Sequence, residues 1–224
     1  KRELEDVIDN DDFPKYGNAL TNFSSQLSTS QSLLAMNVLK DPYRLDFVTL
    51  ERGYDEHDLE SAIAKDITRF LLELGSGFTY VGRQPEFVVG NEGYFPDLLF
   101  YHIRLRCYVV IELKVVDFKP EFAGKLNFYV TACNKLLRQP EDNPTIGLLL
   151  CKSKDQTKVE WAFDSIRNPM GVATYEGIKI KDKLPSVEDL KKRLDMVEQE
   201  LREYKENEEA SNKEDTDDSN QKTE

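Results

Sequence analysis

The sequence is poor in histidine and cysteine, with two of the former and three of the latter among 224 residues. Zinc sites built from histidine and cysteine have ligands at short spacing in the sequence. His57 and His102 form no such set with the three cysteines, which excludes a zinc site of that kind. The cysteines are odd in number and all lie among apolar neighbours. This pattern predicts buried thiols in a reducing compartment rather than a disulfide framework.

The sequence also lacks long hydrophobic runs, because no stretch approaches the roughly 18 consecutive apolar residues of a membrane span. Its start does not read as a secretory signal. We therefore expect a cytoplasmic protein that makes no use of a membrane. The chain begins at Lys1 rather than at Met, which favours a piece of a longer protein.

Positive charge is scarce, since 30 Lys and Arg face 42 Asp and Glu and leave a net charge of −12. Such a balance is unlike the basic footprint of most proteins that bind nucleic acids. The acidity is uneven, however. Residues 187–224 hold 14 acidic and 7 basic groups, whereas residues 80–160 hold 10 acidic and 11 basic groups. The middle of the chain is thus about neutral, and nucleic acid stays open as a partner there.

Composition divides the chain into four parts. Residues 1–40 resemble a linker, and residues 41–185 form the main domain. Over residues 186–205 apolar side chains recur at steps of three and four, which predicts an amphipathic helix that either packs on the domain or pairs as a dimerising coiled coil. Residues 206–224 contain no large apolar side chain, which predicts an acidic disordered tail.

Hydrophobic spacing predicts the elements of the chain. Residues 22–32 are typical of a Ser/Thr/Gln-rich loop, and residues 33–39 of a short apolar turn. An amphipathic helix follows the acidic run at Asp55 and ends before Gly75. Four consecutive strands of a meander come next, and then helix, strand, helix and strand. The strands are expected over 78–81, 86–89, 94–101, 107–116, 146–151 and 172–175, and the helices over 120–138 and 155–165. This order predicts an α/β domain with a mixed sheet and helices on its faces.

The turn between the third and fourth strands determines which residues face each other. A four-residue loop over 103–106 places Asp97 directly opposite Glu112. Because side chains alternate along a strand, Asp97, Glu112 and Lys114 project from one face. The other face is apolar and carries Leu98, Phe100, Val109, Ile111 and Leu113.

Two carboxylates that face each other in so apolar a strand pair repel each other and are poorly solvated. They need a cation, and hard oxygen ligands suit Mg²⁺ or Mn²⁺. In this interpretation Asp97 and Glu112 bind the metal, and Lys114 positions or helps deprotonate the attacking water for phosphodiester hydrolysis. Pro96-Asp97 and Glu112-Leu113-Lys114 read as the motifs PD and ExK. The alternative is a pair of ordinary strands with a solvated polar face.

The helices on either side supply further candidates. Glu60, near the start of the first helix, is a third metal ligand in the functional interpretation and an exposed helical glutamate in the structural one. Lys125 and Tyr129 lie four residues apart on the second helix, so they share a face that offers a cation and a hydroxyl to a phosphate. The alternatives are a lysine whose stem covers apolar surface and a tyrosine of the core.

A series of blocks resembles the YhcG family, bacterial proteins with a C-terminal PD-(D/E)XK nuclease domain. The resemblance covers about residues 40–180 and is carried by 70–75, 77–78, 81–84, 97–102, 110–114, 118–121, 127–129 and 147–152. It implies a restriction-endonuclease-like α/β/α sandwich in which Asp97, Glu112 and Lys114 match the metal and catalytic positions. It also matches Glu60 to the acidic residue that such nucleases carry on the first core helix.

The resemblance implies two further points. In related RecB-type nucleases a Gln stands four residues before a Tyr on the helix after the Lys strand. Tyr129 matches that Tyr, but Lys125 occupies the Gln position. Family members also carry an N-terminal helical domain thought to bind DNA, and residues 16–39 look like the linker at its end. The chain would then be the C-terminal half of a longer protein.

Residues and resemblance together predict a Mg²⁺- or Mn²⁺-dependent nuclease that hydrolyses DNA. It would be an endonuclease or a structure-directed nuclease of repair, recombination or defence against foreign DNA, with the Leu113 carbonyl as an additional metal ligand. Two alternatives stay open on the sequence. One is a non-catalytic nucleic-acid-binding module on the same fold, and the other is a scaffold that forms a homodimer through residues 187–205.

Overall fold

The computed structural model describes residues 19–181 and, beyond them, residues 191, 192, 196, 197 and 199. The chain divides into two compact units, residues 1–181 and 182–224. The helix predicted over 186–205 lies outside the described residues except for those five positions, and the tail predicted over 206–224 lies wholly outside them. Among the described residues, no helix has the length and apolar character needed to cross a membrane.

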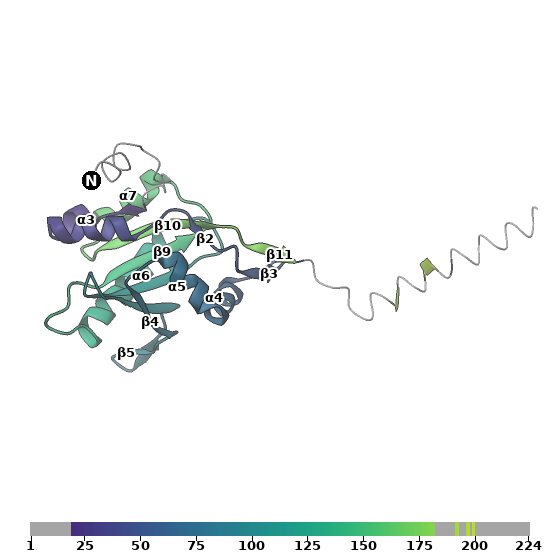
Figure 1. Ribbon diagram of the computed structural model, residues 1–224, viewed down its shortest axis with the longest axis horizontal. Coiled ribbons are helices and arrows are strands. Elements are labelled where there is room, and N and C mark those ends of the chain that lie inside the picture. The colour runs from purple at the N-terminus through teal and green to yellow at the C-terminus, as the bar shows by residue number, and fades with distance from the viewer. Residues whose placement is uncertain (1–18, 182–190, 193–195, 198, 200–224) are drawn as a thin grey trace, which may run out of the picture. The chain divides into compact units, whose positions relative to one another are not determined.

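A mixed seven-stranded sheet forms the middle layer of the first unit (Figure 1). In spatial order its strands are β1 (Leu20–Thr21), β10 (Met170–Glu176), β9 (Ile146–Cys151), β8 (Cys107–Leu113), β7 (Leu98–His102) and β4 (Phe78–Arg83), and β2 (Tyr43–Arg44) also pairs with β10. The strands β10, β9 and β8 are parallel neighbours, whereas β8, β7 and β4 are antiparallel neighbours. The predicted α/β class with a mixed sheet is confirmed.

Helices cover both faces of the sheet (Figure 1). One face packs against α3 (Thr29–Val38), α4 (Glu56–Lys65) and α5 (Ile67–Leu74), and the other against α6 (Pro120–Leu136) and α7 (Gln156–Asp164). Strand β8 contributes to both cores, because Val109 and Ile111 pack on the first face and Val110 packs on the second. The result is the predicted α/β/α sandwich, in which Glu112 shares the face that α6 covers.

The predicted four-strand meander is wrong at its second strand. β4 pairs directly with β7, and the segment between them folds into a separate antiparallel hairpin of β5 (Phe87–Val89) and β6 (Glu92–Tyr94). The strand expected over 94–101 is interrupted because Pro96 has no N–H to donate to a ladder. Elsewhere β3 (Thr49–Glu51) and β11 (Lys179–Lys181) form a parallel pair.

The helix predicted after Asp55 is in fact two helices. Asp55 and Asp58 begin α4 with a reciprocal capping box, in which each side chain accepts the backbone N–H of the other. At Asp66 the backbone leaves the helical region, with φ −121° and ψ 47°, and α5 begins at the next residue. The break lets each short helix direct its own apolar face to the sheet.

The loop predicted over 22–32 and the apolar turn predicted over 33–39 are also wrong. They form α2 (Phe23–Gln26) and α3, in which Phe23, Ser32 and Ala35 are buried. Asn22 ties this segment to the sheet, since its Oδ1 accepts a hydrogen bond from the Met170 N–H at 2.8 Å. The segment is therefore packed against the sheet at least from β1 onward.

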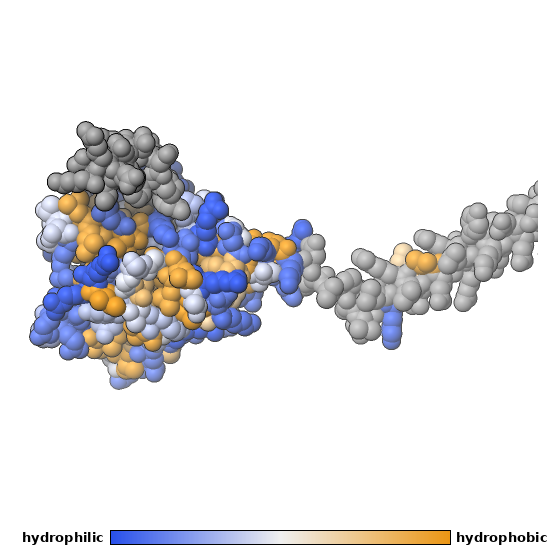
Figure 2. Space-filling model, viewed as in Figure 1, coloured by the Kyte–Doolittle hydropathy of each residue, from blue (hydrophilic) through white to orange (hydrophobic). Residues whose placement is uncertain are grey.

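Apolar side chains reach the surface in several places. The face seen in Figure 2 shows hydrophobic patches separated by hydrophilic residues. Trp161 on α7 and Leu72 on α5 are the most exposed of the large apolar residues that the structure describes, and single exposed apolar residues are ordinary on a protein surface. Two further exposed apolar residues lie on neighbouring elements. They are Phe128 on α6 and Val88 on β5, and α6 contacts β5.

Candidate active site

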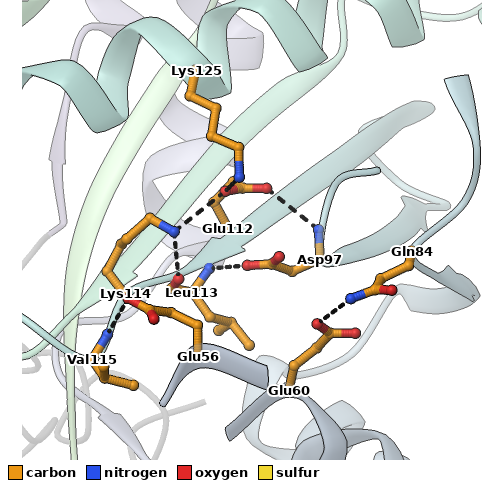
Figure 3. A network of polar contacts seen from close by, with 9 residues as sticks. All are labelled: Glu56, Glu60, Gln84, Asp97, Glu112, Leu113, Lys114, Val115 and Lys125. Carbon is orange, nitrogen blue, oxygen red and sulfur yellow. Dashed lines mark hydrogen bonds and ion pairs between the residues drawn. The ribbon is translucent and has the colours of Figure 1, made fainter. Parts of the chain in front are cut away.

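The hairpin of β7 and β8 holds the two central carboxylates, and its register is the predicted one. Leu98 pairs with Ile111 and His102 with Cys107, so Asp97 lies opposite Glu112. Each carboxylate accepts a backbone N–H from the other strand: Glu112 Oε1 from Asp97 N at 3.4 Å, and Asp97 Oδ2 from Leu113 N at 2.7 Å (Figure 3). These bonds fix both side chains on the face that α6 covers.

Two lysines converge on the Glu112 carboxylate (Figure 3). Glu112 is fully buried, and its Oε2 lies 3.0 Å from Lys125 Nζ and 3.7 Å from Lys114 Nζ. Lys114 Nζ also donates to the Leu113 carbonyl at 3.0 Å. The structure thus brings together Asp97, Glu112, Lys114 and Lys125, with two potential negative charges matched by two cations.

Burial and mutual repulsion shape the ionisation of this group. Burial, followed by the nearby charge of Glu112, raises the pKa of Asp97 to about 7. Burial by itself would lower the pKa of Lys125, but the attraction of Glu112 outweighs it and raises that pKa. Lys125 therefore stays charged at neutral pH, and Asp97 gains a proton readily unless a further cation is present.

Distant residues hold the backbone at Lys114. The Tyr175 hydroxyl on β10 donates to the Lys114 carbonyl at 3.0 Å, and Val115 N donates to Glu56 Oε1 on α4 at 3.4 Å. These contacts fix the end of β8 where Lys114 leaves the strand. Sequence reasoning missed both residues, because Glu56 reads as a capping-region acid and Tyr175 as a core residue of a strand.

Glu60 is buried on α4 but does not join the two central carboxylates. Its Oε1 accepts a short hydrogen bond from Arg83 Nε, and its Oε2 accepts one from Gln84 Nε2 at 2.7 Å. Gln84 adopts a positive φ of 44°, and its N–H donates to the Asp97 carbonyl at 3.0 Å. Arg83 and Gln84 were visible in the sequence only as part of a family block. The role of Glu60 as a metal ligand stays a prediction.

Tyr129 is buried on α6, with the Lys125 ammonium over its ring. It is 5% exposed, and Lys125 Nζ lies 5.2 Å from the centre of its ring. Burial, and then the charge of Glu112, raises the pKa of its hydroxyl. Tyr129 is thus neutral at physiological pH and makes a cation–π contact with the lysine, and its role at a phosphate stays a prediction.

The oxygen atoms of this group suit a divalent metal ion. Asp97, Glu112 and the Leu113 carbonyl present hard oxygen donors of the kind that Mg²⁺ and Mn²⁺ prefer. Burial first, and then the charge of Glu112, disfavours the ionised form of Asp97, and a bound cation would favour it. Within residues 19–181 the structure places no set of three acidic, histidine or cysteine side chains close enough to hold a metal.

Fold and site together define the class of protein. A mixed sheet between helical layers, with Asp97 before one strand and Glu112-x-Lys114 on the next, is the arrangement of a PD-(D/E)XK nuclease domain. Residues 36–195 match the model of the YhcG PDDEXK nuclease domain. The chain belongs to the YhcG family.

Two known proteins are similar to the chain. The "Putative nuclease YhcG" of Escherichia coli (strain K12) is 35% identical over 144 residues, which are 64% of this chain and 38% of that protein. The matched region thus spans less than half of the relative's length. A repair endonuclease from Pyrococcus abyssi of known crystal structure is 14% identical, with 60% of this chain and 49% of that chain covered and a TM-score of 0.34. A similarity this low adds nothing to the assignment.

Proposed function

We propose that this domain hydrolyses DNA phosphodiester bonds with the help of Mg²⁺ or Mn²⁺. The observation that carries the proposal is the buried Glu112 carboxylate, which faces Asp97 across the hairpin and has the ammonium groups of Lys114 and Lys125 on one oxygen. A domain gains no stability from placing two acids so close in an apolar setting. The arrangement is understandable as a site for a cation and an anionic substrate.

Asp97, Glu112 and the Leu113 carbonyl would hold the metal ion. When bound, such an ion supplies Lewis-acid activation of water and neutralises charge on the phosphorus transition state. Lys114 Nζ, held by the Leu113 carbonyl, donates a hydrogen bond that orients the attacking water. Lys125 has a side chain 47% exposed, so it can turn from Glu112 to a non-bridging oxygen of the scissile phosphate.

Charge around the site supports weak substrate binding by this part of the protein. Residues 80–160 hold 11 basic and 10 acidic groups, so the phosphate backbone meets little net attraction before a metal binds. We expect affinity that depends on the metal and falls as salt rises. Stronger recognition would come from other parts of the full-length protein.

Cleavage assays with single-site variants test the proposal. The wild-type chain is incubated with Mg²⁺ or Mn²⁺ and duplex, nicked, forked, four-way and single-stranded DNA, together with an RNA of matched sequence. We expect metal-dependent cleavage of DNA that is abolished by Glu112→Ala and by Lys114→Ala. Lys158→Ala, which removes an exposed lysine on α7, serves as the matched control and should cleave as wild type does.

Binding measurements separate the enzyme from its alternatives. Calorimetric titration with Mn²⁺ should give heat with wild type and much weaker binding with Asp97→Asn. Cleavage that persists in both Glu112→Ala and Lys114→Ala would remove the assignment. Metal-independent DNA binding without cleavage would identify a non-catalytic module, and binding of neither metal nor DNA would identify a scaffold.

The finer parts of the proposal concern the biological setting. We place the activity in the bacterial cytoplasm, where DNA is available, as an endonuclease or structure-directed nuclease in repair, recombination or defence. The domain boundary at residue 185 and the homodimer through residues 187–205 belong to the same proposal, whereas the boundary expected at residue 41 falls inside a segment that packs on the sheet. Light scattering of the chain, with and without residues 186–224, tests the dimer.

A further inference from the structure

Helix α6 has an unusual face beside the site. Gly124 is the fifth residue of this 17-residue helix and is exposed. Glycine destabilises a helix interior relative to alanine, so its presence there calls for a reason. Packing offers none, because a Cβ at Gly124 would meet no described atom within 4 Å. The missing side chain instead leaves open space directly before Lys125, the residue that contacts Glu112.

An aromatic pair lies four residues further along the same face of the helix. Phe128 is 36% exposed, and its ring centre lies 4.6 Å from that of Tyr94 on β6. Phe128 also lies 6.3 Å from its buried neighbour Tyr129, over whose ring Lys125 is placed. Helix α6 therefore carries both the exposed lysine that contacts Glu112 and, within one turn of it, the exposed ring that meets the hairpin of β5 and β6.

We propose that Gly124, Lys125, Phe128 and Tyr94 form a subsite for one unpaired nucleotide next to the scissile phosphate. In this arrangement the base stacks against Phe128 and Tyr94, and the sugar-phosphate backbone passes over Gly124, where no side chain blocks close approach. Lys125 contacts the adjoining phosphate. The inference rests on the proposed nuclease function and deepens it, because it names a substrate with unpaired bases.

The chemistry of the surface favours a nucleotide over other occupants. Aromatic side chains stack on bases of any sequence, and a neighbouring cation serves the phosphate of the same nucleotide. Inside a duplex the faces of a base are covered by the bases above and below it, so this surface is useful only where the strand is unpaired. Continuity with the carboxylate pair ties the occupant to the reacting strand.

Binding of short labelled oligonucleotides to the full chain tests the subsite without requiring catalysis. The probes are fluorescein-labelled oligothymidylate and a duplex, measured by anisotropy at low ionic strength with Ca²⁺ as the divalent ion, because the affinity is expected to depend on a bound metal. Phe128→Ala should weaken binding of oligothymidylate by about 5- to 150-fold, the loss expected for one stacked base, and should leave duplex binding unchanged. Phe128→Tyr should restore it. Leu136→Ala removes another exposed apolar residue of α6 and should behave as wild type.

Gly124→Ala and Gly124→Leu provide a second, independent readout. Both should raise the melting temperature, because the helix gains a better helix former. Gly124→Leu should nevertheless weaken oligothymidylate binding at least as much as Phe128→Ala, a combination that damage to the fold cannot produce. Equal binding by wild type and all of these variants would overturn the subsite, as would absence of oligothymidylate binding by wild type.

The outcomes also separate the subsite from the nuclease. Selective loss of oligothymidylate binding in a chain that cleaves no DNA would refute the proposed function and support the subsite. Normal cleavage and normal oligothymidylate binding in Phe128→Ala would leave the nuclease intact and refute the subsite.

Discussion

Replacing Asp97 with Asn tests whether the paired carboxylates carry unrelieved charge. Asparagine keeps the shape of the side chain and an oxygen that can accept the Leu113 N–H now bound at 2.7 Å. It removes only the ionisation. The variant therefore isolates the cost of placing a negative charge beside the buried Glu112.

The size of that cost follows from the pKa of Asp97, which burial and the charge of Glu112 raise from 3.8 to about 7. Each pKa unit corresponds to about 1.4 kcal/mol, so the difference amounts to at most about 4 kcal/mol. The folded protein holds the proton more tightly than the unfolded chain does. The free energy of unfolding should therefore fall as the pH rises from about 4 to about 7, and it should stay low above that range.

Urea unfolding in EDTA at about pH 4 and about pH 8 measures the effect. Asp97→Asn should match wild type at the lower pH and should be more stable by up to about 4 kcal/mol at the higher pH. At the higher pH Mn²⁺ should stabilise wild type by more than it stabilises the variant, because only wild type offers two carboxylates. A stability difference that is the same at both pH values would refute the reasoning.

Two further variants test how the surrounding fold holds the site. Arg83→Ala should lower the free energy of unfolding by roughly 3–5 kcal/mol, because it leaves the Glu60 carboxylate buried without its cation. Arg69→Ala breaks an exposed ion pair and should lower the free energy of unfolding by less than about 1 kcal/mol. Urea unfolding measures both variants, and equal losses would contradict a stabilising role for the buried pair. Gly147→Ala should cost about 1–3 kcal/mol, since its Cβ would lie 2.8 Å from Val130 on α6 and push that helix outward. The same change should slow cleavage by displacing Lys125, and unchanged cleavage in a destabilised variant would contradict that.

The carboxylate pair was predictable because its geometry is local. A short turn fixes the register of a hairpin, and alternation of side chains fixes the face, so the sequence alone placed Asp97 opposite Glu112. The spacing of Lys125 and Tyr129 predicted a shared face on the next helix, but not the contact of Lys125 with Glu112. The burial of Tyr129 agrees with the core interpretation of that spacing, and its contact with a phosphate stays a prediction.

The errors concern segments whose structure depends on distant partners. Residues 22–39 look polar by composition, but their few apolar residues are enough to pack α3 on the sheet. The hairpin of β5 and β6 leaves the main sheet because β4 finds its partner beyond it. The partners of Glu60 were equally hidden, since Arg83 and Gln84 reach it from another strand end. Each case is a long-range contact that no local pattern encodes.

The reactive groups run from Asp97 to Lys125 in one unbroken stretch of hairpin and helix, and the rest of the chain holds that stretch from β9, β10 and α4. The stretch that carries the chemistry is thus short, but its placement depends on segments from both sides of it in the sequence. Within the stretch, the turn over 103–106 sets which residues face each other. An inserted or deleted residue that shifted this register by one would move Glu112 to the opposite face, so the length of one turn constrains the site as strictly as its reactive residues do.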